Sequence, residues 1–173
     1  RKLLKERILE DMRRNPDRNV FDVSAGDTPG GFCACEGCKA LERKYGTVAG
    51  PLLDFICEVC PVVKEKHPKN LIMALAYRKD QSEPPPKGID SLPDNFMPDF
   101  APIDDNFAKD WTHPDNRQTY ADLKEWCRLC KDVTVQRGAN LFPRIDMEKA
   151  LAELEAAAEA AKKAALPDLE LEP

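Results

Sequence analysis

The sequence has little of several features that would assign it to a function class. It has only two histidines, and 31 Asp and Glu residues outnumber 26 Lys and Arg residues, giving a formal net charge of −5 at pH 7. Phosphate binding needs a basic face, so we expect no nucleic acid partner. No apolar run reaches the roughly 18 residues of a membrane-spanning helix, so we expect no membrane span.

The amino terminus lacks both an initiator methionine and a signal peptide. It opens with RKLLKERILEDM, which already has the apolar spacing of an amphipathic helix. We therefore expect a piece cut from a longer protein. The 173 residues, 42% hydrophobic and 33% charged, fit one domain. A domain of this size buries roughly two-thirds of the surface that its unfolded chain exposes.

The hydrophobic pattern predicts helices that alternate with strands. Helical spacing covers residues 1–14, 36–46, 50–67, 119–131 and 147–166, and strand patterns cover 20–23, 71–77, 132–135 and 168–172. A further strand is expected within 95–107, made irregular by Pro98 and Pro102. Residues 82–89 read as an extended connector, and 136–146 as a loop.

This order favours an α/β fold with a mostly parallel sheet of about five strands. Five strands do not close an eight-stranded barrel. They fit either an open doubly wound sheet or part of a barrel whose first strands are absent.

Seven cysteines fall into three groups, and the most closely spaced group is C-x-C-x-x-C at Cys33, Cys35 and Cys38. Thiolates at this spacing supply three tetrahedral ligands for zinc. A fourth ligand is not evident, because His67 and His113 each precede a proline at an expected element end. Zinc is therefore the only cofactor candidate, and the sequence gives no other.

Two further interpretations of this group stay open. The cysteines pack a loop, or Cys33–Cys38 or Cys35–Cys38 forms a disulfide in a secreted protein. The remaining cysteines form two C-x-x-C pairs, at residues 57–60 and 127–130. Both pairs lie inside helical patterns, where cysteine behaves as a small apolar residue, so we expect core packing.

Residues 20–41, VFDVSAGDTPGGFCACEGCKAL, resemble the signature of a bacterial glycosidase-like family catalogued as domain of unknown function 4838. The signature is a strand, V-S-x-x-D, one or two glycines, C-x-C-x-x-C and a short helix. The similarity continues in order through GPLLDFICEVCPVVKEKHP, LIMALAY, PPPKGI, FAPIDDN, DLKEW and FPRID. The family includes glycoside hydrolase family 163, endo-β-N-acetylglucosaminidases that act on N-glycans.

The resemblance implies a TIM barrel, of which this chain supplies approximately the fourth to eighth strands. Residues 1–173 would then be a single fragment of a glycoside-hydrolase-like barrel, with 20–41 as its Gly- and Cys-rich loop motif. An incomplete barrel exposes strand edges, so we expect missing amino-terminal strands or a partner chain to cover them. The fragment alone should be weakly active or inactive. The resemblance also implies an extracytoplasmic or secreted protein.

Catalytic groups of such a barrel lie at the carboxyl ends of its strands. Glycoside hydrolysis usually needs two carboxyl groups. In enzymes that cut next to N-acetylglucosamine, the acetamido oxygen of the substrate can be the nucleophile. Asp27 is the candidate that orients this group, with Asp105 and Glu172 as candidate partners. A turn cap is the alternative role for Asp27.

Three other residues at expected strand ends are candidates for substrate binding. Tyr77 closes LIMALAY, where its ring can stack on a sugar. Ser24 and Asn106 are candidates for binding sugar hydroxyls. The sequence therefore favours a glycoside-hydrolase-like domain acting on N-acetylglucosamine-containing glycans. The alternatives are a non-catalytic module that binds a glycan or a partner, and a zinc-braced structural domain.

Overall fold

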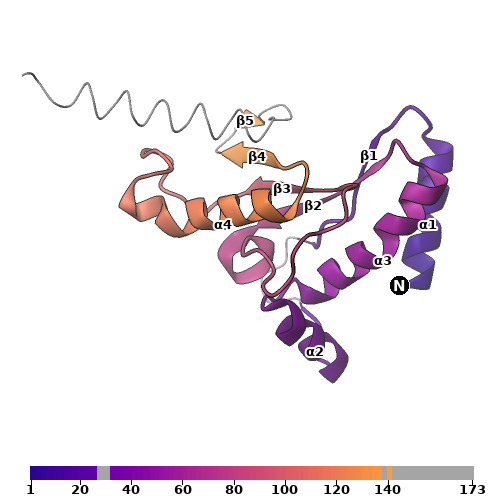
Figure 1. Ribbon diagram of the computed structural model, residues 1–173, viewed down its shortest axis with the longest axis horizontal. Helices are drawn as coiled ribbons and strands as arrows, with labels where there is room; N and C mark the ends of the chain where they lie inside the picture. The colour runs from indigo at the N-terminus through magenta and orange to yellow at the C-terminus, as the bar shows by residue number, and fades with distance from the viewer. Residues whose placement is uncertain (27–31, 138–139, 142–173) are drawn as a thin grey trace, which may run out of the picture.

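A computed structural model describes residues 1–26, 32–137 and 140–141 of the chain. Four parallel strands form one open sheet, and helices precede and connect them (Figure 1). The strands are β1 (Val20–Asp22), β2 (Leu71–Tyr77), β3 (Phe96–Ala101) and β4 (Thr134–Arg137). The helices are α1 (Lys2–Arg14), α2 (Glu36–Tyr45), α3 (Gly50–Lys66) and α4 (Arg117–Leu129). The expected α/β fold is confirmed, as a sheet that is not closed into a barrel.

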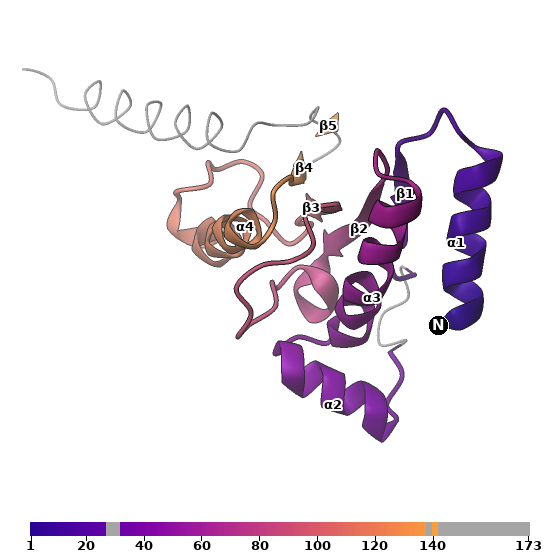
Figure 2. The same cartoon turned by 45° about the vertical axis from the view of Figure 1, so that its right-hand side comes forward.

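The core lies between one face of the sheet and three helices, α1, α3 and α4, which Figure 2 shows around the sheet. Residues of β2 alternate between buried and half-buried. Ile72, Ala74 and Ala76 join the core, whereas Met73, Leu75 and Tyr77 point to the opposite face. Trp126 of α4 and Ile56 of α3 belong to the same core. The helices therefore cover one face of the described sheet.

The prediction of an irregular strand around Pro98 is wrong, because β3 is a regular six-residue strand between β2 and β4. The Ile72 N–H donates to the Asn95 oxygen at 2.9 Å, so by alternation the odd-numbered residues of β3 bond to β2. Pro98 faces β4 instead, and pairing with β4 begins only at Asp99. The missing N–H of Pro98 therefore removes no bond between β2 and β3.

Two local features after the strands were not expected. Residues Arg78–Ser82 form a single π-helical turn, closed by the Glu83 N–H donating to the Arg78 oxygen at 3.1 Å. Arg78 begins this turn with a φ of 61°, which is rare for a non-glycine residue. Asn140–Leu141, expected to be loop, forms the short strand β5 antiparallel to β4.

Several expected features lie outside the described residues. These are the helix at 147–166, the strand at 168–172, and the candidates Asp27 and Glu172. In the described part of the chain, no single helix is long and apolar enough to cross a membrane. Helices α2 and α3 meet that requirement only as a pair, across an 80° bend.

Candidate functional site

Parallel strands end at a common edge of a sheet, and three described candidates follow this rule. Ser24 comes two residues after β1, and Tyr77 is the last residue of β2. Tyr77 lies opposite Ala101, the last residue of β3, and Asp105 follows four residues later. We call this edge, formed by residues 24–26, 77–83 and 101–106, the carboxyl edge. It is where ligands bind in parallel α/β folds.

The Ser24 side chain extends the pairing of β1 with β2. Its hydroxyl accepts from the Leu75 N–H at 2.8 Å and donates to the Asp22 carboxylate. The Ser24 N–H also donates to that carboxylate at 2.7 Å. The hydroxyl hydrogen is thus already engaged by Asp22, and the hydroxyl oxygen holds the end of β1 against β2.

A cavity of about 220 Å³ opens beside Tyr77 and Ser82 at the carboxyl edge. Leu75, Ala25 and Gln81 complete its described lining. Pockets for drug-sized ligands are larger, at about 300–1,000 Å³, so this cavity has room for a small group such as one sugar ring. The half-buried ring of Tyr77 is therefore available to a ligand there.

Gln81 is a feature of this cavity that the sequence did not reveal. Its side chain is only 3% exposed, and its Nε2 has no hydrogen-bond partner among the described residues. A buried donor without a partner costs about 1–3 kcal/mol, so such groups are rare and point to a missing partner. Gln81 thus places an N–H donor without a described partner in the wall of this cavity.

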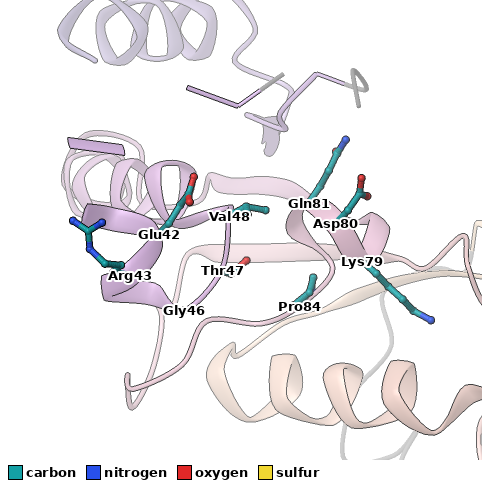
Figure 3. Close-up of a pocket in the computed structure, with 9 residues that line it drawn as sticks. All are labelled: Glu42, Arg43, Gly46, Thr47, Val48, Lys79, Asp80, Gln81 and Pro84. Atoms are coloured by element: carbon teal, nitrogen blue, oxygen red, sulfur yellow. The ribbon is translucent and has the colours of Figure 1, made fainter. Parts of the chain in front are cut away.

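Gln81 also lines a second cavity, of about 410 Å³, between the end of α2 and the π-helical turn (Figure 3). Figure 3 shows Glu42 of α2 across this cavity from Asp80 and Gln81. Arg43 and Lys79 extend outward on opposite sides. The wall is therefore charged and polar, and Gln81 lies where the two cavities approach each other.

Asn106 and Asp105 lie in the loop after β3, and the Asn106 side chain organises that loop. Its amide donates to Asp115 at 2.9 Å, and its oxygen accepts from the Ala108 N–H at 3.2 Å. The buried Asn116 side chain in turn accepts from the Asn106 N–H at 2.8 Å. These bonds fix the loop that carries Asp105, which is half-buried.

Glu83 is a second residue that sequence reasoning missed, because residues 82–89 read only as a connector. Its side chain is 0% exposed, and neither carboxyl oxygen has a hydrogen-bond partner among the described residues. Burial raises its pKa to about 7; Lys79 opposes this rise, and the negative charges of Asp122, Asp104 and Asp105 add to it. A carboxyl with such a pKa is largely protonated below pH 7 and can donate a proton or a hydrogen bond.

The backbone of Glu83 is held firmly, which explains why its side chain stays enclosed. The Trp126 indole N–H of α4 donates to the Glu83 oxygen at 2.8 Å. The Glu83 N–H closes the π-helical turn on Arg78. The only signal in the sequence that points to Glu83 is that it is a polar residue within a few positions of the end of β2.

The seven cysteines form two sets, as their spacing predicted. Cys33, Cys35 and Cys38 gather at the start of α2, with their Sγ atoms all within 4.8 Å of one another. The other four pack in or against the core. Burial raises the pKa of Cys60 and of Cys127 to about 12, and it also raises the pKa of Cys130. The core thiols are therefore protonated and unreactive.

The family described as domain of unknown function (DUF4838) matches residues 1–147, which include every described element. No curated protein and no solved structure matches the chain. The matched range spans most of the chain, including the sheet, the carboxyl edge and the cysteine group. The chain therefore belongs to the DUF4838 family.

Proposed function

We propose that this domain is part of a glycoside hydrolase that acts on N-acetylglucosamine-containing glycans, with the carboxyl edge as its glycan site. The observation that carries the proposal is the cavity beside Tyr77, which is also lined by Gln81, a buried residue whose Nε2 has no described partner. A sugar offers both an apolar ring face and hydroxyl or amide oxygens. The Tyr77 ring suits the first, and the Gln81 amide suits the second.

The chemistry is assigned to the three carboxyl candidates of the sequence. Asp27, which follows Ser24 by three residues, would orient the acetamido group of the substrate. Asp105 or Glu172 would supply the second carboxyl group. The described loop after β3 supports the role of Asp105, because Asn106 and Asn116 fix this loop and β3 ends opposite the end of β2.

The open sheet supports assignment to a larger barrel. In the described part of the chain, β1 pairs only with β2, so its other edge has no strand partner. Helices cover one face of the sheet, as on the outside of a TIM barrel. We propose that further strands or a partner chain pair with β1 and complete the glycan site.

The proposal is tested with the longest natural protein that contains these residues, assayed on an N-glycan and on an aryl N-acetyl-β-glucosaminide. Tyr77→Ala and Gln81→Ala should each lower kcat/KM by at least about 10-fold, as expected for the loss of a stacking surface or of a buried hydrogen bond. The unfolding midpoint and circular dichroism check that both variants remain folded, because Gln81 is buried and its truncation leaves a cavity.

Matched controls use the same residue types on α4. Gln118 is exposed and Tyr120 is half-buried, so Gln118→Ala and Tyr120→Phe should retain full turnover. Glycan binding without turnover in the parent protein would favour a non-catalytic module. Equal turnover in Gln81→Ala, Tyr77→Ala and the parent would exclude the cavity as the glycan site.

A further inference from the structure

We propose that Cys33, Cys35 and Cys38 bind one Zn²⁺ ion as a mononuclear three-thiolate site at the start of α2. The proposal goes beyond the glycan site and does not depend on it. It rests first on the positions of the sulfur atoms, since three sulfurs from six consecutive residues lie within 4.8 Å of one another. All three thiols are free in the structure.

The distances favour a single ion. Zinc holds thiolate sulfurs at about 2.3 Å, so the sulfurs of a tetrahedral site lie about 3.8 Å apart. The sulfur–sulfur distances, all within 4.8 Å, are close to that separation. A [4Fe–4S] cluster holds each cysteine sulfur on a separate iron and thus farther apart.

The local backbone prepares the cysteines for a cation. Cys35 is the N-cap of α2, and Cys38 follows in the first turn. The partial positive charge of the helix start favours a thiolate at this position.

The cations of α2 pair with carboxylates, Lys39 with Glu42 at 2.8 Å and Arg43 with Glu36 at 2.6 Å. A divalent ion would bind the three cysteines as thiolates and displace their protons.

The other residues that commonly bind zinc do not join the site. Among the described residues, no histidine, aspartate or glutamate belongs to the group. The fourth position is therefore assigned to water, which leaves three protein ligands. The two C-x-x-C pairs of the core form no such group among the described residues. The proposed ligands also differ from the core cysteines in exposure, since Cys33 and Cys35 are exposed whereas Cys60 and Cys130 are buried.

The test measures zinc bound to the reduced chain, purified without chelator under anaerobic conditions. We expect about one zinc per chain, and cobalt substitution should give thiolate-to-cobalt absorption bands. Cys33→Ser, Cys35→Ser and Cys38→Ser should each weaken zinc binding by more than about 100-fold. That loss exceeds the 10–100-fold typical of outer-shell changes.

Cys127→Ala is the matched control, because Cys127 lies half-buried on α4 and outside the group. It should bind zinc like the parent chain, and circular dichroism checks that all variants remain folded. Absence of zinc from the folded, fully reduced parent would overturn the proposal. Equal zinc loss in Cys127→Ala, or a disulfide among the three cysteines of the freshly purified protein, would also overturn it.

Discussion

Glu83 is a buried carboxyl without a hydrogen-bond partner among the described residues, so its ionisation is coupled to folding. Its pKa rises from 4.5 in the unfolded chain to about 7 in the folded protein, chiefly because of burial. Between these two values the folded state binds more protons than the unfolded state. Stability from this residue is therefore full below about pH 4.5 and is lost as the pH rises to about 7.

We expect Glu83→Gln to remove that pH dependence, because the amide is neutral in both states. The parent should lose up to about 3 kcal/mol of unfolding free energy between pH 4.5 and pH 7 relative to the variant. Urea denaturation across this range measures the difference. Glu65→Gln, at an exposed position of α3, is the control and should follow the parent. Parallel pH profiles for parent and Glu83→Gln would contradict the raised pKa.

The individual site residues differ in how far the sequence could predict them. Ser24, Tyr77 and Asp105 were found because each follows an apolar strand pattern, and parallel strands place such residues at one edge. Gln81 and Glu83 were missed because their burial depends on the π-helical turn and on Trp126 of α4. Neither the turn nor the contact with α4 can be read from the local sequence pattern.

Among the elements, α2 and α3 lie in close contact at Gly50, the first residue of α3. A Cβ there would overlap the Leu41 carbonyl and come within 2.8 Å of the Glu42 nitrogen, both backbone groups of α2. The backbone of a helix cannot shift to make room for a new atom, whereas the end of a flexible side chain can. Glycine at this position is therefore a packing requirement.

We expect Gly50→Ala to lower the unfolding free energy by about 1–3 kcal/mol or more, as overpacking does. Thermal and urea denaturation measure the loss. Gly37→Ala is the matched control, because a Cβ at Gly37 of α2 meets nothing within 4 Å. That variant should be unchanged or more stable by up to about 1 kcal/mol. Equal stability of Gly50→Ala and the parent would show that the two helices can separate at no cost.

The elements themselves were largely predictable, since long apolar periodicities set α1, α3, β2 and α4. Gly46 ends α2 with a φ of 63°, as the expected helix stop required. The regularity of β3 could not be predicted, because the sequence does not reveal which side of the strand the Pro98 nitrogen faces. That side is set by the pairing of β2 with β3.

At the scale of the whole molecule, the described sheet ends at β1 on one side and at β5 on the other. Strand β1 carries the carboxyl-edge residue Ser24, yet it pairs with only one strand among the described residues. A glycan site built at this edge would gain a wall if further strands paired with β1. The decisive assay therefore uses the longest natural protein that contains these residues.

The most direct measurement is hydrolysis of an N-glycan and of an aryl N-acetyl-β-glucosaminide by that protein, with and without Asp27→Asn. Asp17→Asn is the matched control, since Asp17 lies exposed in the turn before β1, at the opposite end of the same strand. We predict a loss of about 10²-fold or more in kcat for Asp27→Asn and none for Asp17→Asn. Turnover by Asp27→Asn equal to that of the parent would contradict a role for Asp27 in the chemistry, and absence of hydrolysis by the parent itself would contradict the proposed activity.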